Sequence, residues 1–234
     1  MSSAKATAHR AGVLYFLFMI VAIVREFLFP TFMVPGDAAA TARNITAAEP
    51  MYRVGILMSF VTLVMFLFLV ALLYELFRDV DRSHTMLMVL LVGVGVAMSL
   101  ANLIAQFAPL VLLSGADYLS AFTKPQLDAL SLGFLRLHSS GSAAATAFWG
   151  LWLFPFGILV IKSGFFPRIL GILLLVAGFA YVAFSVIALV LPEYRQVAYR
   201  VLMPLYFGEV PIILWLLIKG ANAPQHAAAA SEVR

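Results

Sequence analysis

One glutamate, Glu209, lies inside an apolar run, in the sequence YFGEVP that extends from Tyr206 to Pro211. It is about ten residues from either end of that run, which is about 15 Å along a helix at 1.5 Å per residue. A carboxylate in apolar surroundings must face a protein interior, pair with a base or a hydroxyl, or take up a proton. Pro204 and Pro211 flank it and favour a kink, because proline cannot donate a backbone hydrogen bond. The pattern predicts either a binding group or a structural ion pair.

Polar residues in the other apolar runs are candidate partners for Glu209. Hydroxyl groups at comparable depth come from Tyr181, Ser185, Thr62 and Thr146, and the long side chain of Arg25 could also extend toward this depth. Other polar groups lie nearer one end of the runs. Together these groups predict a polar funnel that ends at Glu209, and its candidate binding residues are Glu209, Arg25, Arg53, Asn102, Arg136, His138, Tyr181 and Ser185. The alternative for Arg53, Arg136 and His138 is that each anchors the chain to lipid headgroups.

The composition indicates whether the chain is a water-soluble protein or a membrane protein. Hydrophobic residues make up 64% of the 234 residues, charged residues make up 11%, and the mean hydropathy is +1.03. Soluble domains are about 45–50% apolar and about 25% charged. The chain therefore belongs in a lipid bilayer. Its net charge of +4 does not indicate nucleic acid, because the basic residues are scattered singly at the ends of apolar runs.

The apolar runs predict an all-α fold, a polytopic transmembrane bundle of six helices. Each run has about 20 residues or more, which is the length needed to cross a hydrocarbon core about 30 Å thick. We expect one transmembrane domain over residues 11–220, a cytoplasmic tail over 1–10 and a disordered cytoplasmic tail over 221–234. The expected spans are 11–29, 52–77, 86–113, 140–161, 168–191 and 200–219.

Basic residues predict the orientation of the bundle. A basic residue follows each of the second, fourth and sixth runs, namely Arg78, Lys162 and Lys219. Another precedes each of the first, third and fifth runs, namely Arg10, Arg82 and Arg168. Lysine and arginine close to short loops are typical of the cytoplasmic side. Both termini are therefore expected in the cytoplasm, and the two longer loops outside it.

Both longer loops are expected to contain short helical segments. In the first, Asp37 can cap a helix over the alanine-rich residues 38–48, and Glu49 lies one helical turn before Arg53. We interpret this helix as a lid, with polar residues Asp37, Arg43, Asn44 and Glu49, and expect Arg43 or Asn44 to face Arg136 and His138. A spacer on the membrane surface is the alternative.

Metal and cofactor chemistry is not expected. Cysteine is absent, which excludes thiolate metal sites and iron–sulfur clusters. The four histidines are His9, His84, His138 and His226, and the predicted topology separates them. A Ser/His dyad is not expected either, because Ser140 lacks a matching motif and the last span has no histidine. The prediction therefore includes no cofactor and no metal and leans away from an enzyme.

Five sequence elements resemble a known family. They are RAGVLYF, PGDAAATARNITAAEPMYRVG, LSGADYLSAF, KSGFFPRILG and GEVPIILWLLIKG, in this order along nearly the whole chain. They resemble domain-of-unknown-function family 4386, whose members are bacterial integral membrane proteins with six helices. The resemblance implies this architecture and a bacterial inner membrane. It carries no activity, ligand or catalytic residue over to this chain.

Two functions of different classes fit these patterns. In the first, the protein binds or transports a small amphipathic or lipid-like molecule, with Glu209 as the buried charge. In the second, it is a structural or accessory protein whose polar groups fix helix packing and which partners a second copy or another membrane protein. An enzyme that acts on lipid is the third. A cavity ending at Glu209 would favour the first, and a dry bundle with paired polar groups the second.

Overall fold

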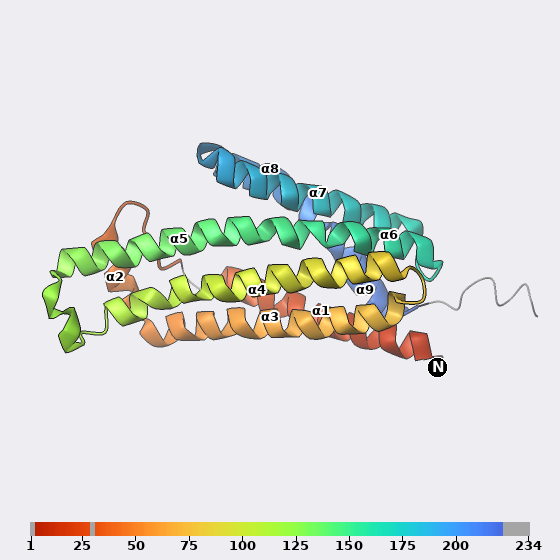
Figure 1. Cartoon of the computed structure of the whole chain (residues 1–234), viewed down its shortest axis with the longest axis horizontal. Coiled ribbons are helices and arrows are strands. Elements are labelled where there is room, and N and C mark those ends of the chain that lie inside the picture. The colour runs from red at the N-terminus through yellow and green to blue at the C-terminus, as the bar shows by residue number, and fades with distance from the viewer. Residues whose placement is uncertain (1–2, 29–30, 222–234) are drawn as a thin grey trace, which may run out of the picture. The chain divides into compact units, whose positions relative to one another are not determined.

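The computed structural model describes residues 3–28 and 31–221 (Figure 1). Within these residues every regular element is helical, as the sequence predicts. The elements are α1 (Ser3–Leu28), α2 (Ala38–Ala47), α3 (Glu49–Phe77), α4 (Arg82–Leu112), η1 (Asp117–Ala121), α5 (Lys124–Leu151), α6 (Leu153–Ser163), α7 (Arg168–Val190), η2 (Pro192–Tyr194), α8 (Arg195–Tyr206), η3 (Phe207–Glu209) and α9 (Val210–Ile218).

Six helical segments in the described residues are long and apolar enough to cross a membrane, which confirms the predicted number. They are Lys5–Arg25, Glu49–Phe77, Arg82–Leu112, Lys124–Ser163, Arg168–Val190 and Pro192–Ile218. The first helix begins at Ser3, inside the segment expected as a tail, and the predicted C-terminal tail lies outside the described residues except for Ala221. The fourth segment is longer than 140–161 because the helix begins at Lys124, where Pro125 is tolerated in its first turn.

Residue contacts divide the chain into two units. Unit 1 holds residues 1–19, 65–96 and 143–234, and unit 2 holds residues 20–64 and 97–142. Helices α1, α3, α4 and α5 contribute residues to both. Each unit is described by itself.

In unit 1, two reciprocal glycine contacts bring neighbouring helices together. A Cβ atom at Gly171 would lie 2.5 Å from the carbonyl oxygen of Gly157, and one at Gly157 would lie 2.8 Å from that of Gly171. Gly150 and Gly178 form the same arrangement, at 2.7 and 2.9 Å. Gly150 in α5 and Gly157 in α6 are seven residues apart in the membrane segment Lys124–Ser163, and Gly171 and Gly178 are seven residues apart in α7, so the two contacts fix an antiparallel register. Small residues serve this purpose in membranes, where close van der Waals packing drives helix association.

An ionic cluster in unit 1 joins the turn between α3 and α4 to the end of α6. The Nζ atom of Lys162 lies 2.7 Å from a carboxylate oxygen of Asp81, and Asp81 also accepts from the backbone N–H of His84. The Lys162 ammonium group and this N–H hold the pKa of Asp81 well below its usual range. Asp81 thus caps α4 and contacts the basic end of α6 at once.

In unit 2, helix α2 packs against the main helices. Asp37 caps it by accepting from the backbone N–H of Ala40 at 2.8 Å, which confirms the predicted cap. Thr41, Ala42 and Ile45 form its buried face, and Ile45 belongs to a core cluster with Tyr52, Ile56 and Leu135. This face explains why the alanine-rich segment is ordered as a helix beside α3 and α5.

Candidate functional site

The last membrane segment is interrupted at the candidate glutamate. Helix α8 ends at Tyr206, a short 3₁₀ turn covers Phe207–Glu209, and α9 begins at Val210. Pro211 has no backbone N–H to donate to the carbonyl oxygen of Phe207 one turn earlier. The interruption therefore follows from the sequence, and it places Glu209 where two helical pieces meet.

Two glycines allow neighbouring helices to approach this interruption closely. A Cβ atom at Gly208 would lie 2.6 Å from the carbonyl oxygen of Leu173 in α7. A Cβ atom at Gly12 in α1 would lie 2.4 Å from both the carbonyl carbon of Leu216 and the backbone nitrogen of Leu217. Glycine is needed at both positions because the opposing atoms are backbone atoms, which cannot move aside as a side chain can. These contacts bring α1 and α7 within hydrogen-bonding reach of Glu209.

Two tyrosine hydroxyls bind the Glu209 carboxylate. Tyr15 in α1 donates to Oε2 of Glu209 at 2.5 Å, and Tyr181 in α7 also forms a side-chain hydrogen bond with Glu209. Tyr15 is 1% exposed, whereas Glu209 is half-buried. Among the ion pairs of the described residues, none joins a lysine, arginine or histidine to Glu209. Neutral hydroxyl donors therefore occupy the place that a basic partner would take.

Aromatic rings surround these hydroxyls. The Tyr15 ring contacts the rings of Phe66 and Trp152, at centroid distances of 6.4 and 6.5 Å. The Tyr181 ring stacks on Tyr206 at 3.9 Å with an angle of 6° between the planes. The hydroxyl of Tyr206 is buried and has no hydrogen-bond partner within the described part of the chain. The site thus combines one carboxylate, aromatic faces and one unpaired buried donor.

Ser185, a further candidate from the sequence, forms a hydrogen bond to a neighbouring helix. Its hydroxyl donates to the backbone carbonyl oxygen of Ala143 at 2.7 Å and links α7 to α5 within unit 1. Sequence reasoning also missed Tyr15. The sequence did contain one indication of Tyr15: it lies ten residues from each end of the membrane segment Lys5–Arg25, at the same central depth as Glu209.

Asn102 and His138 form a reciprocal pair in unit 2. The Nδ2 atom of Asn102 donates to the backbone carbonyl oxygen of His138 at 2.9 Å and to Oγ of Ser142 at 3.0 Å. The Nδ1 atom of His138 lies 3.0 Å from the carbonyl oxygen of Asn102. A carbonyl oxygen can only accept, so Nδ1 must carry the proton. A Cβ atom at Gly141 would lie 2.2 Å from Oδ1 of Asn102, so this pair needs a glycine opposite it.

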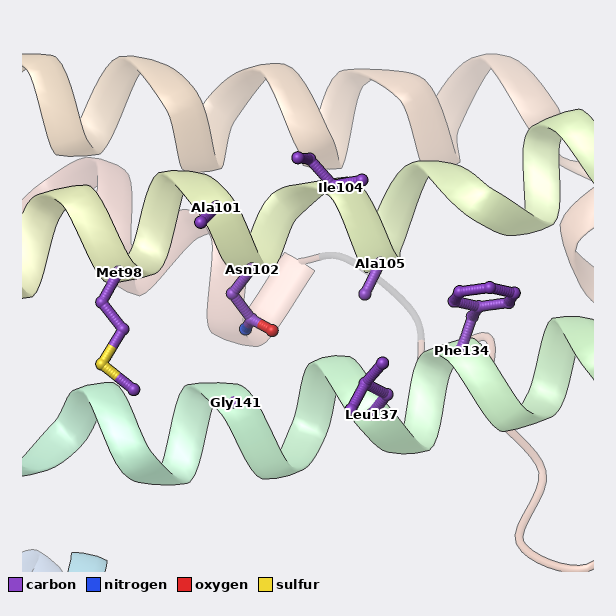
Figure 2. Close-up of a pocket in the computed structure, with 8 residues that line it drawn as sticks. All are labelled: Met98, Ala101, Asn102, Ile104, Ala105, Phe134, Leu137 and Gly141. Carbon is purple, nitrogen blue, oxygen red and sulfur yellow. The ribbon is translucent and has the colours of Figure 1, made fainter.

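A shallow groove runs beside this pair. Figure 2 shows Asn102 extending from α4 toward α5 near Gly141, with apolar side chains on either side. The groove has a volume of about 390 Å³ and is lined by Met98, Ala101, Asn102, Ile104, Ala105, Phe134, Leu137 and Gly141. Because Ile104 and Leu137 are well exposed, the groove lies on the surface of unit 2.

The remaining candidates lie at exposed positions of unit 2. Arg25, Arg43, Arg53 and Arg136 are exposed, and Arg25 acts electrostatically on His138. Arg53 pairs with Glu49 at 2.8 Å, which confirms their expected common face. Asn44 donates to the backbone carbonyl oxygen of Phe32 at 3.3 Å. The expected approach of Arg43 or Asn44 to Arg136 and His138 stays a prediction. The lid role of α2 stays a prediction.

The fold and the site define a polytopic α-helical membrane protein with a carboxylate at a helix interruption. Residues 10–220 match the family described as "Domain of unknown function (DUF4386)", and the chain belongs to this family. It is also similar to an "Uncharacterized protein" of Archaeoglobus fulgidus, at 37% identity over 73 residues. This match covers 31% of the chain and 42% of the archaeal protein, so it spans less than half of that relative. No solved structure matches the chain.

Proposed function

We propose that this protein binds a small amphipathic or lipid-like molecule within its membrane domain and that Glu209 holds the polar head of that molecule. The observation that carries the proposal is a carboxylate at an interrupted membrane helix, bonded by neutral hydroxyls alone among the described residues. Interrupted helices form the binding sites of many transporters, because they leave polar backbone and side-chain groups at mid-membrane depth. An ionised carboxylate only accepts hydrogen bonds, so the head should donate them or carry positive charge.

The surrounding rings support a head of this kind. Tyr15, Phe66 and Trp152 present aromatic surfaces beside the carboxylate. Aromatic faces attract cations and also pack well against alkyl chains. An amphipathic amine has both parts and is the chemical class that we propose to test.

A structural role has one specific observation in its favour. The bond between Tyr15 and Glu209 joins α1 to the last membrane segment, across 194 residues of sequence. A buried pair of this kind fixes the packing of two helices without any ligand. Under this second candidate function, Glu209 would be needed for assembly and stability alone.

Tryptophan fluorescence can test the first proposal. The three tryptophans, Trp149, Trp152 and Trp215, all belong to unit 1. Titration of the protein in lipid nanodiscs with bromododecylamine, a quencher, should give saturable quenching that dodecylamine reverses. Glu209→Gln should weaken binding by about tenfold or more, because hydrogen bonds to charged groups contribute about 1.5–3 kcal/mol.

Two controls define the outcome of this titration. Glu75→Gln makes the same chemical change at an exposed position of α3 and should leave the affinity unchanged. Bromododecanoate carries the opposite charge and should not saturate the site. Equal affinity of the amine for the unaltered protein and for Glu209→Gln would refute ligand binding at Glu209 and favour the structural role.

We further propose that the protein lies in the inner membrane of a bacterium with both termini in the cytoplasm. The support is the row of basic residues at one set of helix ends, which includes Arg82, Lys162 and Lys219. Single cysteines at Ala40 and Ala116 should react with an impermeant thiol reagent added to intact cells, and one at Ser83 should not. The native chain has no cysteine to give a background. Labelling at Ser83→Cys alone would show that the orientation is the opposite of the one proposed.

A further inference from the structure

We infer that the Glu209 carboxyl exchanges a proton with one aqueous face of the membrane through a row of tyrosine hydroxyls on Tyr181, Tyr206 and Tyr199. This inference concerns the same carboxylate as the proposed function, but it goes beyond that function because it requires no amphiphile. It assigns the transfer of this proton to three tyrosines of unit 1.

The spacing of the residues forms the row. Tyr199 and Tyr206 are seven residues apart, and Glu209 follows three residues later, so all three lie on one face of the last membrane segment. At about 1.5 Å per residue the row extends about 15 Å from Glu209. Figure 1 shows α7 beside α8, and the contacts between them place Tyr181 against Tyr206.

The two ends of the row differ in exposure. Tyr181 hydrogen-bonds to Glu209 and interacts electrostatically with Tyr206 and Tyr199. Tyr199 is 40% exposed and its ring contacts Phe184 at 6.0 Å. Tyr15, which donates to Glu209 from α1, is 1% exposed. The row therefore leads from the half-buried Glu209 to Tyr199, the most exposed of the three tyrosines.

The hydroxyl of Tyr206 supplies the independent observation. It is buried and has no hydrogen-bond partner in the described part of the chain, and Tyr206 interacts electrostatically with both Tyr181 and Tyr199. A buried unpaired hydroxyl is costly, and such groups are commonly satisfied by water. Phenylalanine would stack equally well on Tyr181 without this cost. The Tyr206 ring stacks on Tyr181 and the residue interacts electrostatically with Tyr199, so one bridging water on either side would complete a hydrogen-bonded chain.

The transfer conserves every atom and needs no oxidant. Each hydroxyl accepts one proton on a lone pair and releases its own proton to the next group, with water joining hydroxyls that do not touch. One proton thereby moves from the aqueous face to the carboxylate, and each tyrosine ends neutral. The groups that face Glu209 are Tyr15 from α1 and Tyr181 from α7, and Tyr206 from α8 stacks on Tyr181. Among the described ion pairs, none supplies a competing charge at Glu209.

Infrared spectroscopy tests the row directly. The carboxylic acid C=O band that Glu209→Gln removes should appear on acidification of the protein in nanodiscs and shift when water is replaced by D₂O. Tyr206→Phe should slow this isotope exchange by about tenfold, which corresponds to a barrier raised by about 1.4 kcal/mol. The control Tyr194→Phe, at an exposed position of η2, should exchange at the native rate.

Each outcome of this experiment decides the inference. Tyr206→Phe should keep native thermal stability or exceed it, since it removes a hydroxyl that has no partner in the described residues. Exchange in Tyr206→Phe as fast as in Tyr194→Phe would overturn the path. Absence of an acid band that depends on Glu209 at every pH would also overturn it. Neither result would affect the amine titration, so failure of the path and failure of ligand binding can be told apart.

Discussion

Gly12→Ala is expected to destabilise the protein by roughly 1–3 kcal/mol, the range measured for overpacked interiors. The added methyl carbon would lie 2.4 Å from two backbone atoms of Leu216 and Leu217. Since backbone atoms of a packed helix cannot rotate away, α1 must shift, and the hydrogen bond between Tyr15 and Glu209 lengthens or breaks. Thermal unfolding in detergent should show a clear fall in the midpoint temperature.

Gly93→Ala is the matched control for this substitution. Gly93 also lies within a membrane helix, α4, but a Cβ atom there has no neighbouring atom within 4 Å. Alanine should therefore be neutral or stabilising at Gly93, because alanine is favoured over glycine in helices by about 0.8–1.0 kcal/mol. Equal stability of the two variants would show that α1 does not approach α9 as closely as described.

Glu209→Leu should be strongly destabilising for a different reason. It removes the acceptor of the Tyr15 and Tyr181 hydroxyls. A buried donor left without a partner costs about 1–3 kcal/mol, so the loss of two is a large effect. Glu209→Gln keeps an amide oxygen in place and should retain most of the stability. The measurement is again the midpoint of thermal unfolding in detergent.

The comparison of these two variants separates the roles of Glu209. If the carboxylate binds a ligand, Glu209→Gln should fold and bind the amine more weakly than the unaltered protein does. If the carboxylate is purely structural, neither the unaltered protein nor Glu209→Gln should bind the amine at this position. Native stability in Glu209→Leu would mean that the two tyrosines find other acceptors and would remove the basis for a buried polar site.

Features set by neighbouring residues could be predicted from the sequence. The six spans follow from the length and hydropathy of each run, and Asp37 caps α2 because the cap depends on amides within one turn. The pair Glu49 and Arg53 follows equally from helical spacing. The break at Glu209 is another local consequence, since Pro211 removes a backbone donor.

Contacts between distant helices could not be predicted in the same way. Depth along a helix selected Tyr181 as a partner of Glu209, but Tyr15 requires the knowledge that α1 lies beside α9. The pairing of Asn102 with His138 likewise depends on the rotation of α4 and α5 about their axes, which no single run encodes. The predicted funnel combined groups that belong to both units, and its continuity stays a prediction.

The most direct measurement of the central claim is an experimental structure of the protein with bromododecylamine, grown in a lipid phase, in which bromine is located by its anomalous scattering. Our proposal predicts an amine nitrogen within hydrogen-bonding distance of a Glu209 carboxylate oxygen, in place of or beside the Tyr15 hydroxyl. Bromine found only on the lipid-facing surface, with Glu209 still bonded to Tyr15 and Tyr181 in a dry interior, would contradict it.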